Sequence, residues 1–559
     1  MKCKGAQILM EILLEQGCDV VFGYPGGTVL DIYEELYRYE GKIRHILTSH
    51  EQGAAHAADG YARATGKVGV CLATSGPGAT NLVTGIATAY LDSIPLLAIT
   101  GNVASSVIGQ DTFQEVDIVG VTLGIVKHSY TVRRVEDLAF ILREAFSLAS
   151  SGRPGPVLVD IPKDIQQAVT EFFPAAGPAP KKKPASLYTE KEIEEAVSML
   201  KASKKPCLYI GGGVLSSDAG AEVLAMAEKI DAAICQSLLG LSAVSAENPR
   251  VLGMSGMHGG YAANRAIHEC DLLIAVGARF SDRAVGDKKK FAKNAAILHI
   301  DADQAEIDKN VKSTLGLIGD AKEILERLNA RLENVSHPEW KKDVAGMKRL
   351  EKETEQHFEG LLSPYGVIDE VAKVVNPDTP IVTDVGQHQM WVAQRYPFKE
   401  PRTCLSSGGL GTMGYGMGAA NGAAVATGKK TVLFTGDGSF AMNMNELGTA
   451  VTHGLPVIVV LMNNRVLGMV RQLQNFFSHA HYSQTTTNRR TDFVRLAEAF
   501  GAIGLKAATP DEFRVAFQKA WEAEGPALIE CQINPDDFVY PMVPPNRSFE
   551  EIMLPKKQG

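Results

Sequence analysis

Two stretches near the carboxyl end decide the fold: KTVLFTGDGSF at residues 430–440 and LPVIVVLMNN at residues 455–464. Each starts with a short run of apolar residues, many of them β-branched, which is typical of a buried strand. The first strand ends in Gly-Asp-Gly and the second in Asn-Asn, and Asn463 follows Ser439 by 24 positions. The two stretches therefore predict neighbouring strands of a parallel sheet with polar residues at their carboxyl ends.

This arrangement has chemical consequences, because ligands of open parallel sheets bind beyond the carboxyl ends of the strands. Asp437 and Asn464 would then bring oxygen atoms to one hard cation such as Mg²⁺, which needs few protein ligands when substrate phosphates complete its shell. The glycines beside Asp437 would let the backbone approach a diphosphate closely. The alternative is two independent turns at strand ends.

Composition sets the broad class of the protein. The 559 residues suggest about three domains. A formal net charge of −8 gives no electrostatic reason to expect nucleic acid or an anionic membrane as a partner. The eight cysteines form no Cys-x-x-Cys pair, so we expect neither a zinc site nor a redox motif, and we expect a cytoplasmic location. The apolar runs are too short for a membrane span.

Strands alternate with helical stretches in three blocks, which predicts an α/β fold of three doubly wound parallel-sheet domains. The expected blocks are 1–165, 191–335 and 361–545. Residues 166–190, rich in Pro, Ala and Lys, are expected to form an exposed linker, and a charged helix is expected near 338–360. Residues 546–559 would be a polar tail. Whether blocks one and three are duplicates of one fold stays open at this point, because their sequences do not show it.

The Gly-Asp-Gly and Asn-Asn pattern resembles the motif of thiamine-diphosphate enzymes, and so do DVGQHQMW (384–391) and SSGGLGTMGYG (406–416). The resemblance implies a C-terminal pyrophosphate domain, with Mg²⁺ held by Asp437, Asn464 and Val466. It further implies cofactor contacts from Gly386, Gln387, His388, Gly411, Met413, Gly436, Asp437, Gly438, Ser439, Leu467, Gly468 and Met469. Met413 would be the apolar wedge that keeps the cofactor bent, although a Met in such a loop is also a common gap filler in cores.

The first block would be the pyrimidine-binding domain by the same resemblance. Glu51, in HEQGA (50–54), matches the glutamate whose carboxyl group contacts the aminopyrimidine ring. An isolated acid there would read as a first-turn residue favoured by the helix dipole. In this family the glutamate and the cation-binding aspartate meet across a subunit interface, which implies at least a homodimer.

Further segments resemble the acetohydroxyacid synthase family over nearly the whole chain. These are VFGYPGG (21–27), TSGPGATN (74–81), DTFQEVDIVG (111–120), GRPGPVLVDIPKD (152–164) and YPMVPP (540–545). The resemblance implies that pyruvate is decarboxylated and joined to a second 2-keto acid. It also implies a homodimer or homotetramer, with a small regulatory subunit as a further possible partner. The implied substrate-side residues are Gly27, Phe113, Gln114, Lys163 and Arg283.

Two of these residues could also be ordinary surface residues without a role in the site. Arg283 suits a substrate carboxylate, because arginine pairs with carboxylates in a bidentate manner, but it could equally be a surface ion-pair partner. Lys163 could be a solvated lysine at a strand end. Leu473 occupies a position where the family usually has Trp, so we expect the preference for 2-ketobutyrate over pyruvate to be weak.

The central block resembles the FAD-binding domain of the same family. GGG (211–213) is a weak phosphate-loop signal alone, and strand-end acids such as Asp301 hold a ribose hydroxyl in some proteins and cap helices in others. The resemblance implies flavin contacts from Arg153, Gly211, Gly212, His258, Arg279, Asp301 and Asp320, with FAD in a structural role. The competing interpretations are a pyruvate oxidase-like enzyme with a redox-active flavin and a non-catalytic paralogue.

Overall fold

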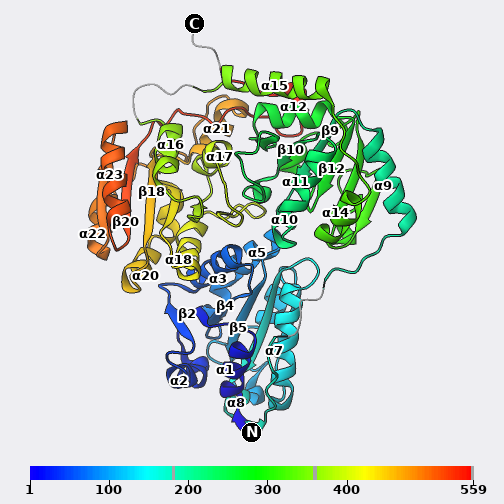
Figure 1. Ribbon diagram of the computed structural model, residues 1–559. Coiled ribbons are helices and arrows are strands. Elements are labelled where there is room, and N and C mark those ends of the chain that lie inside the picture. Colours follow the sequence, from blue (N-terminus) through cyan, green and yellow to red (C-terminus); the bar gives the residue numbers. More distant parts are fainter. Residues whose placement is uncertain (179–182, 357–361, 556–559) are drawn as a thin grey trace.

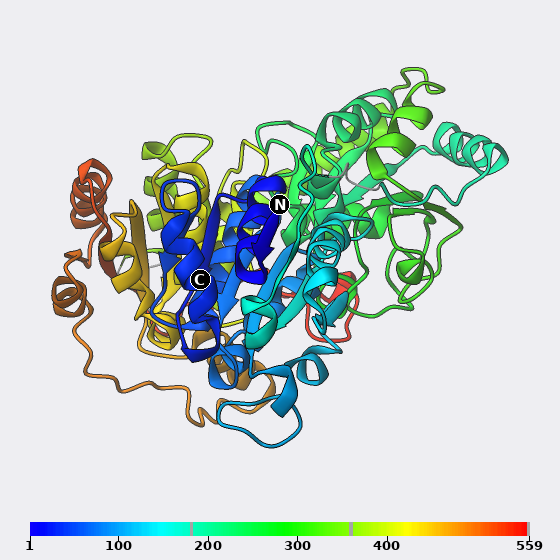
Figure 2. The ribbon, with the colours of Figure 1, turned by 90° about the horizontal axis from the view of Figure 1, so that it is seen from below.

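The computed structural model describes residues 1–178, 183–356 and 362–555. Three successive parts of the chain each form a six-stranded parallel sheet with helices on both faces (Figure 1). The predicted α/β class with three parallel-sheet domains is thereby confirmed. The N-terminal domain lies below the other two in Figure 1, and the view from below in Figure 2 places it in front of them.

The N-terminal sheet has the strand order β3-β2-β4-β5-β7-β6. Helices α1, α2, α7 and α8 cover one face, and α3 to α6 cover the other. The strands are β2 (Val20–Gly23), β3 (Arg44–Leu47), β4 (Gly69–Ala73), β5 (Leu96–Asn102), β6 (His128–Thr131) and β7 (Pro156–Pro162). The helices are α1 (Gly5–Glu15), α2 (Leu30–Arg38), α3 (Glu51–Thr65), α4 (Pro77–Asn81), α5 (Val83–Asp92), α6 (Ile118–Thr122), α7 (Val135–Ser150) and α8 (Lys163–Gln167).

The central sheet has the order β11-β10-β9-β12-β13-β14, which is the order common in dinucleotide-binding domains. Its strands are β9 (Pro206–Ile210), β10 (Ala233–Gln236), β11 (Val251–Met254), β12 (Leu272–Val276), β13 (Ala296–Asp301) and β14 (Leu315–Ile318). Its main helices are α9 (Glu190–Ala202), α10 (Gly212–Ser216), α11 (Gly220–Lys229), α12 (Tyr261–Glu269), α13 (Asp282–Val285), α14 (Ala321–Asn329) and α15 (Pro338–Glu353). Helix α15 confirms the first part of the charged helix expected near 338–360, but it ends at Glu353, and 357–360 lie outside the described residues.

The C-terminal sheet has the order β16-β15-β17-β18-β20-β19. Numbered from its own first strand, this is the same order as in the N-terminal sheet, so the two domains share one topology that their sequences do not reveal. The strands are β15 (Ile381–Thr383), β16 (Cys404–Ser406), β17 (Thr431–Gly436), β18 (Val457–Asn463), β19 (Ile503–Ala507) and β20 (Ala527–Gln532). The helices are α16 (Pro364–Val374), α17 (Gln387–Arg395), α18 (Tyr415–Thr427), α19 (Asp437–Asn443), α20 (Glu446–Thr452), α21 (Gly468–Phe477), α22 (Phe493–Phe500) and α23 (Pro510–Glu522).

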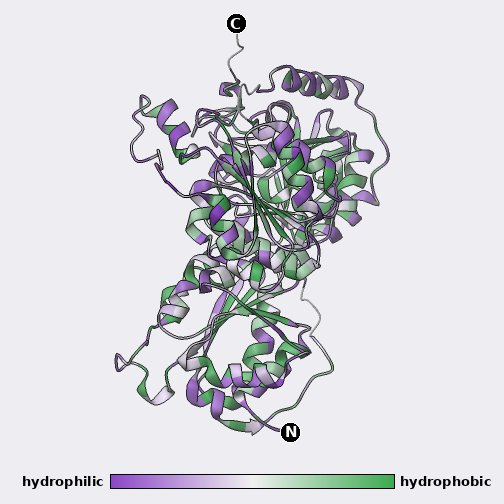
Figure 3. Ribbon diagram, turned by 90° about the vertical axis from the view of Figure 1, so that its left-hand side faces the viewer, coloured by the Kyte–Doolittle hydropathy of each residue, from purple (hydrophilic) through white to green (hydrophobic). Residues whose placement is uncertain are grey.

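The connecting segments carry structure of their own. Within the expected linker 166–190, β8 (Val169–Glu171) pairs antiparallel with β1 (Lys2–Lys4), and 179–182 lie outside the described residues. Residues 546–555 of the expected tail return to the central domain, where Phe549 of the short helix η5 (Phe549–Glu551) is buried, and 556–559 lie outside the described residues. Hydrophobic residues, green in Figure 3, gather in the strands of the sheets. In the described part of the chain, no helix has the length and apolar character that crossing a bilayer requires.

Helices α3 and α18 join the N-terminal and C-terminal domains by close backbone contact. Both are rich in Gly and Ala, and nearly all their residues are buried. A Cβ atom at Gly422 would collide with the carbonyl oxygen of Ala57, and one at Gly60 would collide with that of Ala419. The glycines therefore set the distance between the two domains.

We expect Gly422→Ala to destabilise the protein by about 1–3 kcal/mol, because overpacking forces the backbones of α3 and α18 apart. Gly346→Ala in α15 is the matched control, since a Cβ atom there meets nothing within 4 Å. That change should stabilise the helix by up to about 1 kcal/mol. Thermal unfolding of both variants measures the difference, and a Gly422→Ala protein as stable as the control would contradict the close contact.

Candidate active site

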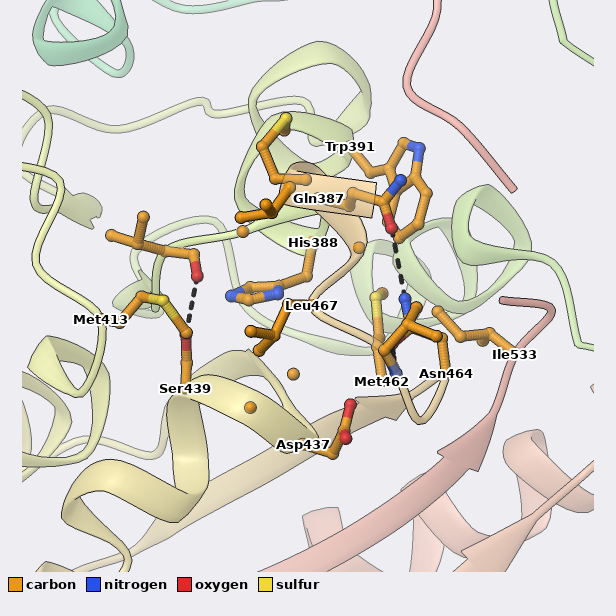
Figure 4. Close-up of a pocket in the computed structure, with 18 residues that line it drawn as sticks. Gln387, His388, Trp391, Met413, Asp437, Ser439, Met462, Asn464, Leu467 and Ile533 are labelled. Carbon is orange, nitrogen blue, oxygen red and sulfur yellow. Dashed lines mark hydrogen bonds between the residues drawn. The ribbon is translucent and has the colours of Figure 1, made fainter. Parts of the chain in front are cut away.

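A pocket opens at the carboxyl edge of the C-terminal sheet, where strand order reverses between β15 and β17 (Figure 4). Such reversals leave a crevice between neighbouring loops, and open α/β sheets bind ligands there. Most of the lining residues lie at the carboxyl ends of β15, β17, β18 and β20 or in the first turns of α17, α19 and α21, and Met413 comes from the loop between β16 and α18. The lining residues are Val385, Gly386, Gln387, His388, Trp391, Met413, Gly436, Asp437, Gly438, Ser439, Met462, Asn464, Val466, Leu467, Gly468, Met469, Val470 and Ile533.

The structure thus gathers in one place every residue that the sequence marks for cofactor or cation contact in this domain, except Gly411. Gly411 has a left-handed backbone with φ +68°, and a Cβ atom there would lie 4.0 Å from the Val385 side chain. Sequence reasoning missed Val385, Trp391, Met462, Val470 and Ile533. Trp391 could have been predicted as a lining residue, since it lies one helical turn after Gln387 in α17 and therefore on the same face of the helix.

Asp437 is the main charged group of the pocket and is 2% exposed. Its Oδ2 atom accepts a hydrogen bond from the Thr487 hydroxyl at 3.3 Å, and its Oδ1 atom is buried without a hydrogen-bond partner. Burial raises the pKa of this carboxyl group to about 6. A buried acceptor that no protein donor satisfies is costly, so Asp437 has spare capacity for a cation or a donor from a ligand.

Asn464 lies near Asp437, and its side-chain amide donates to Gln387 Oε1 at 3.2 Å (Figure 4). The side-chain oxygen of Asn464, Oδ1, accepts from the Val466 backbone N–H at 3.1 Å. Gly468 begins α21 beside this pair, and any Cβ atom there would collide with Gln387 Oε1. The glycine is therefore required for the pocket to keep its shape.

The remaining polar groups favour an anionic ligand next to a cation. Helices α17 and α21 both begin at the pocket, and helix N-termini attract phosphate groups. His388 is buried with its Nε2 atom unpartnered, and burial lowers its pKa to about 3, so its ring is neutral at pH 7. Among the described residues, no three His, Cys, Asp or Glu side chains form a metal cluster, so a cation here would depend on uncharged oxygens and on ligand phosphates.

Glu51 does not line this pocket, whose lining residues all come from the C-terminal domain. It is the first residue of α3, and it is buried, with Oε2 accepting from the Asn81 amide at 2.9 Å. His50 caps the helix by accepting the Gln52 backbone N–H. Within one chain, the two halves of the predicted site therefore lie apart.

The predicted substrate-side residues come from separate elements of all three domains. Gly27 begins the short helix η1 (Gly27–Val29), Lys163 begins α8, and Leu473 lies half-buried on α21. Phe113 is 87% exposed, and the adjacent Gln114 has a left-handed backbone with φ 60°. Arg283 is exposed on α13, with one guanidinium nitrogen 3.3 Å from the Met257 sulfur. The chain does not bring these residues to the C-terminal pocket.

The predicted flavin residues gather at the carboxyl edge of the central sheet. Gly211 follows β9, and a Cβ atom there would lie 2.6 Å from Ala278 Cα, so the loops after β9 and β12 touch. His258 is buried, with Nδ1 unpartnered, and burial lowers its pKa to about 4. Asp301 ends β13, and burial raises its pKa to about 6. Asp320 caps α14 by accepting the Glu323 backbone N–H.

Arg153, Arg279 and Gly212 complete this group. Arg153 forms ion pairs with Asp303 and Glu306, whereas Arg279 donates to the Leu91 carbonyl oxygen. Gly212 begins α10, after the carboxyl end of β9, where the strand order reverses between β9 and β12. The Ser255 hydroxyl is also buried without a hydrogen-bond partner and directly follows β11, so this edge of the sheet has polar atoms that a ligand could satisfy.

Comparison with known families agrees with this geometry. Models of the thiamine pyrophosphate enzymes match in chain order: the N-terminal TPP binding domain over residues 3–121, the central domain over 193–328 and the C-terminal TPP binding domain over 384–531. These matches place the chain in the class of thiamine pyrophosphate enzymes.

Comparison with individual relatives identifies the family within this class. The acetolactate synthase large subunit of Haemophilus influenzae is 40% identical, covering 100% of this chain and 99% of the relative. That of Corynebacterium glutamicum is 45% identical over 98% of this chain and 90% of the relative, and the isozyme 2 large subunit of Escherichia coli is 45% identical over 98% and 99%. The chain belongs to the acetolactate synthase large-subunit family.

We expect Gly468→Ala to raise the thiamine diphosphate concentration needed for half-saturation by about 10-fold. Disturbing the residues that support metal ligands typically lowers affinity or activity by about 10–100-fold. The cause would be displacement of the Gln387 and Asn464 side chains. Quenching of Trp391 fluorescence reports binding, because this indole lines the pocket. Gly525→Ala is the control, as a Cβ atom there meets nothing within 4 Å. Equal affinities of the two variants would show that Gly468 does not shape the site.

Proposed function

We propose that the protein is an acetolactate synthase, which decarboxylates pyruvate and joins the two-carbon unit to a second 2-keto acid. The observation that carries the proposal is the pocket of the C-terminal domain. It combines an unsatisfied buried carboxylate, Asp437, with the Gly-Asp-Gly and Asn-Asn strand ends. Relatives of the same length and named for this activity support the choice of reaction.

We propose that this pocket holds the diphosphate of thiamine diphosphate together with Mg²⁺. The donor set fits, because Asp437 Oδ1 lacks a partner, and Asn464 and the Val466 carbonyl supply neutral oxygens of the kind that Mg²⁺ takes. Gly436, Gly438 and Ser439 leave the backbone accessible, and Gly386, Gln387 and His388 border the opposite side. Met413, Leu467 and Met469 supply an apolar wall for the rings of the cofactor.

The bound cofactor supplies a nucleophilic carbon and an electron sink. The role proposed for Glu51 is to hold a proton against a ring nitrogen of the aminopyrimidine, which requires a carboxyl group shielded from water. Its burial at the start of α3 and its hydrogen bond from Asn81 fit such a role. Arg283 and Lys163 would bind substrate carboxylates, and Gly27, Phe113 and Gln114 would border the second keto acid.

We further propose that each complete site uses two chains. Glu51 and the Asp437 pocket lie apart within one chain, and Phe113 and Met442 are exposed apolar side chains that a second copy would cover. A homodimer is then the smallest active form, and a homotetramer would be built from it. The relatives are named large subunits, so a small regulatory subunit is proposed as a further partner.

We propose FAD as a structural cofactor of the central domain. The strand order suits a dinucleotide, and Arg153, Arg279 and the unpartnered His258 Nδ1 offer donors at the carboxyl edge of the sheet. Asp320 is less suited, since its carboxylate already caps α14.

Product analysis tests the reaction. Purified protein given pyruvate, thiamine diphosphate, Mg²⁺ and FAD should form acetolactate, detected as acetoin after acidification, with one CO₂ released for every two pyruvates. Under anaerobic conditions the flavin should stay oxidised. Stoichiometric flavin reduction with acetate as product would favour the oxidase interpretation, and absence of any turnover would favour a non-catalytic protein.

We expect Glu51→Gln to lower turnover by ~10²–10⁴-fold while thiamine diphosphate binding stays near that of the wild type, because an amide cannot move the proton. Glu35→Gln is the matched control, as Glu35 is a buried acid of α2 on the opposite face of the same sheet. Acetolactate formation rates and fluorescence titrations measure the two effects. Near-wild-type turnover of Glu51→Gln would rule out the proton-transfer role.

We expect Leu473→Trp to raise the share of acetohydroxybutyrate formed when pyruvate and 2-ketobutyrate compete. A wide indole gives the extra methyl group a flat apolar contact, and one methylene in such a pocket is worth about 1–3 kcal/mol, or ~10–200-fold in discrimination. Val515→Trp, a change at an exposed residue of α23, is the control. An unchanged product ratio would mean that Leu473 does not set specificity.

A further inference from the structure

The carboxyl end of α5 is a point where all three domains touch. Three consecutive residues there, Leu91, Asp92 and Ser93, each bind a different partner, and Ser93 ends the helix in a left-handed conformation with φ 60°. None of the three belongs to the motifs that identify the family. Asp92 is the only acid of this turn, and it is buried.

Asp92 binds the backbone of the C-terminal domain directly. Its Oδ2 atom accepts from the Gly408 N–H at 3.0 Å, and its Oδ1 atom accepts from the Gly409 N–H at 2.6 Å. A Cβ atom at Gly409 would lie 2.7 Å from Oδ1, so only glycine fits there. Two consecutive backbone amides thus donate hydrogen bonds to one carboxylate across the domain boundary.

Arg63 of α3 balances the charge of this carboxylate. Its Nη2 atom donates to Asp92 Oδ2 at 2.8 Å and its Nε atom to Asp59 Oδ1 at 2.6 Å, while Nη1 donates to the Ser406 carbonyl oxygen at 2.8 Å. The Tyr415 hydroxyl also donates to Asp59. All of these groups are buried, and removing one partner from such a network leaves the others unsatisfied.

The segment held in this way, residues 406–414, leads into the thiamine pocket. Thr412 shares a 2.7 Å hydrogen bond with Thr88 of α5, and the Gly414 N–H donates to Asp384 Oδ1 at 2.9 Å. Between these two anchors lies Met413, which lines the pocket. The contacts of α5 therefore fix one wall of a site to which the N-terminal domain of the same chain contributes no lining residue.

The same turn is also tied to the central domain. Arg279 donates to the Leu91 carbonyl oxygen at 2.6 Å, and Arg153 donates to the Ser93 hydroxyl at 2.8 Å. Arg153 is itself paired with Glu306 at 2.7 Å. The position of Asp92 is thus determined from both sides.

We propose that Asp92 is a positioning residue for thiamine diphosphate binding: its carboxylate fixes residues 406–414 so that Met413 borders the pocket. This inference rests on the proposed function of the pocket. The role needs a carboxylate, because Asp92 accepts three hydrogen bonds through two oxygens. An asparagine would turn its NH₂ group towards at least one of these donors.

The test compares Asp92→Asn with Asp231→Asn. Asp231 is an equally buried acid of the central domain, paired with Arg250 and Lys341 and hydrogen-bonded to the His337 N–H. We expect Asp92→Asn to raise the half-saturating thiamine diphosphate concentration by about 10-fold, the usual cost of losing an outer-shell partner. The KM for pyruvate at saturating cofactor should stay unchanged, and Asp231→Asn should bind the cofactor as the wild type does.

Hydrogen exchange of the unliganded proteins separates this inference from the proposed function. Peptides covering 406–414 should exchange faster in Asp92→Asn than in the wild type and in Asp231→Asn. Unchanged exchange there, or equal loss of cofactor affinity in both variants, would overturn the inference. A wild type that does not bind thiamine diphosphate would instead overturn the proposed function.

A second variant covers the case in which Asp92→Asn does not fold. Thr412→Val removes the hydrogen bond to Thr88 and leaves the charged network intact. It should weaken cofactor binding and speed exchange of residues 406–414 in the same direction but by less. Wild-type behaviour of Thr412→Val in both measurements would contradict the inference.

Discussion

The close backbone contact between α3 and α18 is the constraint on which the rest of the structure depends. It joins two domains of equal topology through helices that carry Gly and Ala where larger side chains would collide. Helix α3 begins with Glu51 and carries Arg63 three turns later, while α18 follows directly after residues 406–414. This one interface thus positions both Glu51, the proposed proton carrier, and the segment 406–414 that borders the cofactor pocket.

Two buried aspartates, Asp92 at the domain boundary and Asp437 in the pocket, differ in how far their oxygen atoms are hydrogen-bonded within the protein. Asp92 has both oxygens occupied, by two backbone amides and an arginine, so its charge is used within the fold. Asp437 keeps one oxygen unpartnered, and burial raises its pKa to about 6. Since an unsatisfied buried acceptor costs stability, its persistence at the end of β17 indicates a ligand that satisfies it.

Much of the fold and of the candidate site could be predicted from the sequence, because the signals lie in short continuous segments. Apolar runs such as 455–462 predicted strands, and the residues that follow such runs in a parallel sheet share one edge, which located Asp437 and Asn464 together. Strand order was not readable, because it depends on contacts between distant segments. Ile533 therefore escaped notice, as it reaches the pocket only because β20 pairs with β18. Asp92 was missed for the same reason, since the two backbone amides that it binds are 316 and 317 positions away.

We propose that each chain carries two half-sites, each of which a second copy of the chain completes. Mixing Glu51→Gln with Asp437→Ala protein under conditions that exchange subunits tests it most directly. In a twofold dimer with shared sites, half of the dimers are mixed and each has one intact site, so acetolactate formation should return to about a quarter of the wild-type rate. A mixture no more active than the two variants measured separately would contradict the claim and place Glu51 and Asp437 in the same site of one chain.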